Sequence, residues 1–139
     1  MNKKQYSMLL LTAIMLLLVA QCMSQTLKVS GKLLLNDKTT LEKFKVSVVD
    51  LDNDSTYTKE VVNGFTTNLD YNKNYLIVIS RQGFQTKAIA VDTHCNLDKP
   101  FKYLFYVNLI DTEPIVPDAQ YAGGIFFNKN KKEFDYYLR

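Results

Sequence analysis

Apolar and polar residues alternate with a period of two along most of the chain between residues 27 and 110. In the first such stretch the apolar members are Leu27, Val29, Leu33 and Leu35. This spacing separates a buried set of side chains from a solvated set when the backbone is an extended strand. After residue 24, no run of ten or more residues shows the spacing of an amphipathic helix. The sequence therefore predicts an all-β fold.

Seven short strands are predicted, separated by turn-forming residues. They span residues 27–35, 44–48, 57–62, 65–69, 75–80, 84–91 and 102–110. Short strands at intervals of roughly 8–12 residues are typical of an antiparallel β-sandwich. We predict that residues 25–111 form this sandwich.

Four local features refine this prediction. Residues 57–62 are polar enough for an edge strand, whereas residues 75–80 are apolar on both faces, which predicts a central strand covered on both sides. Asn63-Gly64 predicts a two-residue hairpin with a type I′ turn. The apolar phase slips within residues 84–91, and a β-bulge at residues 86–88 would restore it.

The N-terminal segment has the pattern of an export signal. Lys3 and Lys4 precede residues 8–20, which carry no charge. That run is shorter than the ~20 apolar residues of a membrane-spanning helix, and it has the length of a signal-peptide core. Small residues at the −3 and −1 positions allow cleavage before Gln25. We predict that residues 1–24 are a signal peptide and that the protein is exported, to the periplasm, the outer-membrane surface or the medium.

Two other fates of this segment remain open. An uncleaved segment would tether the protein to a membrane. Alternatively, residues 19–22 (VAQC) place Cys22 where a bacterial lipobox has its acylated cysteine, although Gln21 stands where a lipobox has Gly, Ala or Ser. Acylation there would make the protein an outer-membrane lipoprotein anchored at Cys22.

Charge and cysteine content restrict the partners. The formal net charge of +3 is too small to indicate a nucleic-acid partner. Cys95 is the only cysteine after residue 24, so a processed chain has no intramolecular disulfide, and its unpaired thiol is open to an intermolecular one.

Residues 112–139 differ in character from the predicted sandwich. Two prolines between residues 113 and 118 predict an extended linker, and the tail that follows is rich in aromatic residues. An apolar tail in an exported protein must pack somewhere, either on its own sandwich as an added hairpin or on a partner. The candidate partner-binding residues are Phe126, Phe127, Phe134, Tyr136 and Tyr137.

Residues 27–110 resemble the carboxypeptidase regulatory-like domains, a group of transthyretin-like β-sandwiches. Residues 29–33 (VSGKL) are similar to the opening strand of the family, and residues 44–48 (FKVSV) to its second strand. Residues 63–65 (NGF), 75–79 (YLIVI) and 83–84 (GF) resemble the run in which a Gly-Phe hairpin leads to a Tyr-led strand and a Gly-aromatic turn.

The resemblance implies a seven-stranded antiparallel Greek-key β-sandwich, here with a C-terminal β tail. It also implies an accessory module without a peptidase site. Such modules accompany enzymes, outer-membrane receptors and cell-surface assemblies, and the versions in gram-negative envelopes are the most similar.

One cluster suggests chemistry. Asp92, His94 and Cys95 include the only histidine and the only cysteine after residue 24. A Cys–His pair needs its side chains within hydrogen-bond reach, but neighbours in a strand point to opposite faces. A zinc site needs three or four ligands. We therefore interpret the cluster as a loop, with a small metal- or thiol-dependent enzyme centred on His94 and Cys95 as the alternative.

Two charged groups are interpreted as turns. Residues 50–54 (DLDND) resemble a calcium loop in composition but lack its Gly and Glu spacing. Lys129, Lys131 and Lys132 lie in a predicted solvated turn.

The prediction from sequence is thus a non-catalytic exported β-sandwich module, without a cofactor or metal. It would bind an envelope protein or glycan, or serve as a structural accessory of the cell envelope. Membrane contact would come only through a lipid on Cys22 or through a partner.

Overall fold

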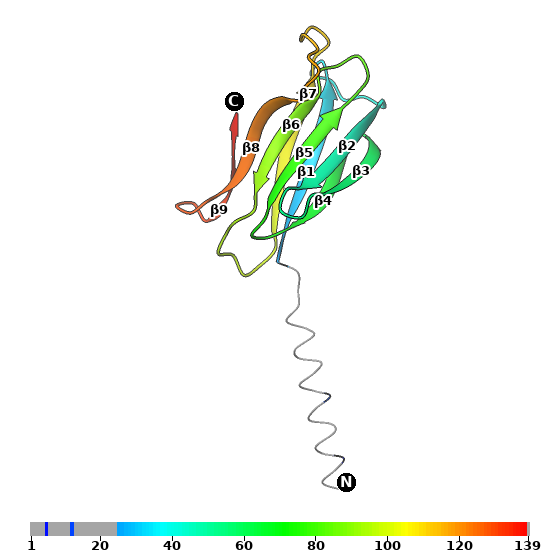
Figure 1. Ribbon diagram of the computed structural model, residues 1–139. Coiled ribbons are helices and arrows are strands. Elements are labelled where there is room, and N and C mark those ends of the chain that lie inside the picture. The colour runs from blue at the N-terminus through cyan, green and yellow to red at the C-terminus, as the bar shows by residue number, and fades with distance from the viewer. Residues whose placement is uncertain (1–4, 6–11, 13–24, 139) are drawn as a thin grey trace.

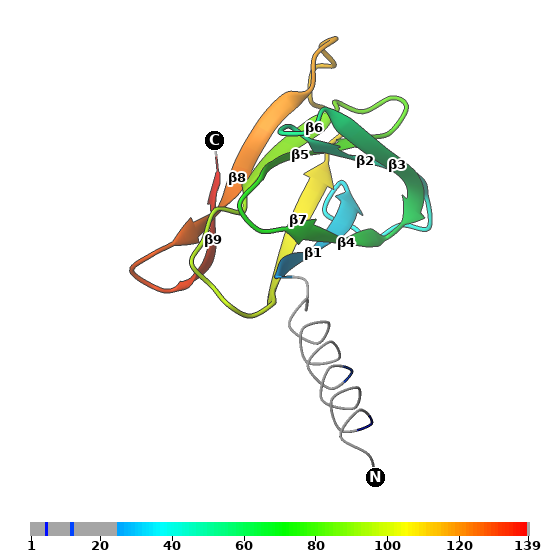
Figure 2. The ribbon, with the colours of Figure 1, turned by 60° about the horizontal axis from the view of Figure 1, so that its bottom comes forward.

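The structure, a computed structural model, describes Gln5, Thr12 and residues 25–138, and the described chain is all-β. Two sheets lie face to face as a sandwich (Figures 1 and 2). The predicted signal peptide lies outside the described residues except for Gln5 and Thr12. Within the described part of the chain, no helix has the length and hydropathy of a membrane span.

The smaller sheet has three strands in the order β4-β1-β7. They are β1 (Thr26–Leu35), β4 (Gly64–Asp70) and β7 (Phe101–Leu109). β1 pairs antiparallel with β4 and parallel with β7.

The larger sheet has six strands in the order β3-β2-β5-β6-β8-β9. They are β2 (Lys43–Asp50), β3 (Ser55–Val62), β5 (Asn74–Ser80), β6 (Lys87–Asp92), β8 (Gln120–Asn128) and β9 (Glu133–Leu138). β3 is an edge strand, as its polar sequence predicts.

The prediction of a wholly antiparallel sandwich is wrong for two strand pairs. β7 runs parallel to β1, and β8 runs parallel to β6. In both cases a connection between the sheets returns the chain to the starting end of the earlier strand. Residues 93–100 bring Phe101 beside Leu27, and residues 110–119 bring Gln120 beside Lys87.

The core lies between the two sheets and takes alternate side chains from most of the strands, which is the pattern that the period of two predicts; from β3 only half-buried Val61 packs against it. Its largest fully buried members are Phe44, Leu27, Leu33, Leu69, Ile77, Ile79, Ile89, Leu109 and Ile125.

Asn63-Gly64 does not form a hairpin, so that prediction is wrong. β3 belongs to the six-stranded sheet and β4 to the three-stranded sheet, so the two residues carry the chain from one layer to the other. Only Asn63 has a positive φ, of 63°. Its carbonyl accepts a hydrogen bond from Leu33 N at 2.9 Å, which fixes this crossing against β1.

Two further details differ from the sequence predictions. β5 is central in its sheet, but Leu76 and Val78 on its outer face remain half-buried, because no second layer of described residues covers them. The phase slip before β6 arises because Phe84 precedes the strand. The register shift lies opposite, in β8, where Ala88 pairs with Tyr121 and Ile89 pairs with Gly123.

The C-terminal tail packs on its own sandwich, which was one of the two alternatives. Buried Gln85 holds the linker: its side chain donates to Asp118 O at 2.8 Å and accepts from Val116 N at 2.6 Å. Lys87 donates to Gln120 Oε1 at 2.7 Å and forms an ion pair with Glu113. The β8–β9 hairpin then extends the six-stranded sheet beyond the edge of the smaller one (Figure 2).

Candidate functional site

Phe134 is placed in the core rather than on the surface. Its side chain is 4% exposed and lies among the rings of Tyr71, Phe101 and Phe127, with centroids 5.5–6.1 Å away. This cluster joins the hairpin to the three-stranded sheet, through Phe101 of β7 and Tyr71 directly after β4. Phe134 is therefore unsuited to contact a partner, because its surface is already used within the chain.

The other four candidate residues divide between the two faces of the hairpin. Phe127 and Tyr136 share the inner side with Phe134 and are half-buried. Phe126 and Tyr137 share the outer side, with ring centroids 5.9 Å apart. Tyr137 is 44% exposed, and its ring covers Gly124 on the neighbouring strand. The prediction that these four bind a partner stays a prediction.

Two free strand edges flank one hollow. β7 ends the three-stranded sheet and β9 ends the six-stranded sheet. Between them lies a hollow of about 250 Å³, whose lining includes Tyr106 and Val107 of β7 and Tyr136 and Leu138 of β9. Leu138 is 80% exposed there, so this edge presents apolar surface beside unpaired backbone.

The structure brings Asp92 and His94 together. His94 Nδ1 lies 2.7 Å from Asp92 Oδ1, and both side chains are more than half exposed. Half-buried Cys95 lines the same hollow as His94, with Asn72 and Lys129. Across residues 25–138, no group of three or more His, Cys, Asp or Glu side chains is arranged to hold a metal ion.

The acidic turn at residues 50–54 is organised by Asp50. Its carboxylate accepts hydrogen bonds from Lys73 Nζ at 2.9 Å and from the backbone N–H groups of Asp52 and Asn53. The Asn53 side chain donates a fourth, at 2.8 Å. The Lys73 hydrogen bond holds the pKa of the Asp50 carboxyl below its usual value, with further lowering by the Asn53 and Asp52 donors. These oxygens are engaged by protein donors, which makes this a structural turn.

The Asp50 turn predicts how stability responds to acid. A carboxyl whose pKa is lowered in the folded state stabilises the fold above its unfolded pKa of about 3.9, and this contribution is lost as the pH falls through the folded pKa. In Asp50→Asn, the urea midpoint should therefore decrease less steeply than in wild type as the pH falls below about 4. Asp98→Asn, in the exposed loop before β7, is the control and should retain the wild-type acid profile. An unchanged profile in Asp50→Asn would contradict this role.

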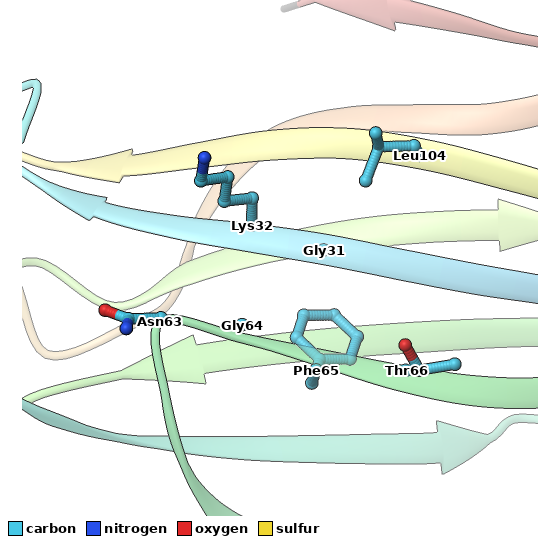
Figure 3. A pocket seen from close by; sticks show the side chains of 7 residues that line it. All are labelled: Gly31, Lys32, Asn63, Gly64, Phe65, Thr66 and Leu104. Atoms are coloured by element: carbon cyan, nitrogen blue, oxygen red, sulfur yellow. The ribbon is translucent and has the colours of Figure 1, made fainter. Parts of the chain in front are cut away.

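A third hollow lies on the three-stranded sheet, and the sequence analysis did not predict a site there. It is open, about 410 Å³ in volume, and lined by Gly31, Lys32, Asn63, Gly64, Phe65, Thr66 and Leu104 (Figure 3). The available signal was a second apolar set within residues 102–110. Leu104 and Tyr106 alternate with the buried set and are 60% and 59% exposed.

Comparison with known proteins does not assign the chain to a family. No family model matches the chain, and no curated protein matches it. Solved structures that resemble it include a catechol 1,2-dioxygenase from Acinetobacter sp. ADP1, inhibited by bound mercury, with 10% sequence identity and a TM-score of 0.42. That match covers 71% of this chain and 59% of the dioxygenase chain, which is less than two thirds of its length.

Proposed function

We propose that this chain is a non-catalytic β-sandwich module of the cell envelope, exported by its N-terminal segment, which binds an envelope protein or glycan through its surface. The charge-free run at residues 8–20 behind Lys3 and Lys4 supports export. The apolar filling of the space between the sheets supports a function at the surface. We further propose that β1 to β7 form a transthyretin-like Greek-key unit of the carboxypeptidase regulatory-like kind, with β8 and β9 as its tail.

The free edge of β9 carries this proposal. Exposed edges invite pairing with another chain, and proteins usually protect them with charged residues. The opposite edge strand, β3, is protected in this way by Lys59 and Glu60 near its centre. In β9 the charged residues, Glu133 and Asp135, are confined to the first half, and the second half, Tyr136, Tyr137 and Leu138, carries no charge. An extended segment of a partner added here would gain backbone hydrogen bonds and apolar contacts together.

Site-specific cross-linking in intact cells tests this edge. A photoreactive residue at Leu138 should give a discrete adduct in the envelope fraction. The same residue at Tyr57, on the β3 edge and 62% exposed, should give none, which makes it the matched control. Equal labelling from both positions, or none from Leu138, would contradict partner binding at β9.

The N-terminal mass of the same sample tests export separately. A chain that begins at Gln25, free or cyclised, supports signal-peptide cleavage, and a lipid-modified Cys22 supports the anchored alternative. A cytoplasmic chain that retains Met1 would contradict export. His94, which contacts Asp92 and lines a hollow with Cys95, keeps the enzyme alternative open. Stoichiometric metal that His94→Ala removes would favour that alternative instead.

A further inference from the structure

The outer face of the three-stranded sheet combines positive charge with exposed apolar side chains. We call it the basic face and define it by Lys28 and Lys32 of β1 and by Lys102, Leu104 and Tyr106 of β7. All five side chains are exposed, because they occupy the strand positions that alternate with the core. The hollow in Figure 3 lies on this face, beside Lys32 and Leu104.

The lysines of the basic face are left without acidic partners. Lys28 and Lys102 are direct cross-strand neighbours, and like charges in that position destabilise a sheet. On the other side of β1, Lys28 pairs with Asn68 and Lys32 with Gly64. Elsewhere, lysines at positions 43, 73, 87 and 131 form ion pairs with carboxylates. Among the ion pairs of the described residues, none includes a lysine of the basic face, so its charge is available to an external anion.

Leu104 and Tyr106 give the basic face an apolar centre. They are 60% and 59% exposed, although burial of side chains of this size would stabilise the fold. Lys32 Nζ lies 5.8 Å from the centre of the Tyr106 ring, so charge and apolar surface adjoin. A tyrosine with a polar tip, an exposed leucine and flanking lysines suit the boundary between lipid headgroups and acyl chains.

The position of the N-terminus agrees with this chemistry. β1 and β7 are parallel and start at the same end of the sheet, where Lys28 and Lys102 lie opposite each other. Residues 1–24 join the sandwich at that end, directly before Gln25 and β1. Any apolar or acylated segment that the processed protein keeps before Gln25 is therefore attached at the end that carries the lysine pair.

We propose that the basic face docks on the surface of an anionic lipid bilayer. Leu104 and Tyr106 enter the headgroup layer, and Lys28, Lys32 and Lys102 bind lipid phosphates. The inference rests on the proposed envelope location, since that is where the module meets such a surface. Both a lipid and a polysaccharide attract lysines, but the exposed leucine at the centre of the face favours the lipid.

Vesicle binding of the protein, purified as its host processes it, tests the inference. Vesicles of phosphatidylethanolamine with phosphatidylglycerol are compared with vesicles of phosphatidylethanolamine with phosphatidylcholine. The ratio of the two affinities is the readout, because an apolar or acylated N-terminus contributes to both. K28Q/K32Q/K102Q should lower this ratio about 100-fold, at about five-fold for each lysine near an anionic surface. The matched control, K38Q/K45Q/K129Q, removes three exposed lysines elsewhere and should keep the wild-type ratio.

Two further variants test whether the apolar side chains of the basic face enter the lipid. Leu104→Ser and Tyr106→Ser should each weaken binding to the anionic vesicles several-fold, with unchanged circular dichroism, because both side chains are exposed. Lysine-dependent binding to the anionic vesicles that is unaffected by both substitutions would overturn the proposal that Leu104 and Tyr106 enter the headgroup layer. Equal losses in the two lysine triples, or no loss in either, would also overturn it. The N-terminal mass reports export independently, so a failure of docking and a failure of the proposed location are distinguishable.

Discussion

Truncation of the chain after Asp111 is expected to abolish cooperative folding, because the β8–β9 hairpin completes the core. Ile125 and Phe134, both removed by the truncation, are 1% and 4% exposed. Loss of one large apolar side chain from a core costs about 2–5 kcal/mol. Two such losses approach the 5–15 kcal/mol that typically separates folded from unfolded states. The truncation also turns β6 into an unprotected edge.

Urea unfolding followed by near-ultraviolet circular dichroism measures this effect. Wild type should show one cooperative transition and the truncated chain none. Two single variants compare the contributions of the two sides of the hairpin to the free energy of unfolding. Phe134→Ala, in the core, should lower this free energy by about 3–5 kcal/mol. Tyr137→Ala, on the outer side of the hairpin and 44% exposed, should cost clearly less. A truncated chain with the wild-type midpoint would show instead that the hairpin is a separable appendage.

Replacement of Gly31 is expected to destabilise the sandwich, although alanine normally suits a strand better than glycine. A Cβ atom at this position would point into the core, 2.7 Å from Phe65 Cζ and 3.1 Å from Phe105 Cζ. Those two rings already pack edge to face, with centroids 5.9 Å apart. Overpacking of this kind costs about 1–3 kcal/mol, so Gly31→Ala should lie in that range and Gly31→Val at or above its upper end.

The free energy of unfolding, from urea titration, measures the Gly31 effect. Lys28→Ala on the outer face of the same strand is the control and should change stability by no more than about 0.5 kcal/mol. Adding Phe65→Leu to Gly31→Ala should recover part of the loss, because the smaller side chain frees space beside the new methyl group. A Gly31→Ala protein as stable as wild type would show that the rings rearrange without cost.

The strands were predictable because alternation with a period of two is a local signal. Their partners were not. Asn63-Gly64 reverses the chain as turn residues do, but local chemistry does not determine whether the next strand joins the same sheet or the opposite one. In the same way, apolar residues on both faces of β5 indicated its central place but not whether another layer covers Leu76 and Val78.

The surfaces with functional interest depend on pairings between distant strands. Lys28 and Lys102 become neighbours only because β7 runs parallel to β1, and no periodicity predicts that pairing. The aromatic tail was recognisable as a segment that must pack. Its division into a buried Phe134 and an exposed Tyr137 follows from the register of β9 on β8, which alternation alone leaves undetermined between two choices.

The place of β1 between β4 and β7 also sets an order of events in folding. β1 precedes both of its neighbours along the chain, at residues 64–70 and 101–109, so its sheet is complete only when the chain has grown past both. Pairings over such sequence separations are slow, on the order of milliseconds to seconds. A growing chain of this topology therefore stays unfolded for much of its synthesis, which is the state that a translocation channel requires of a chain threaded through it.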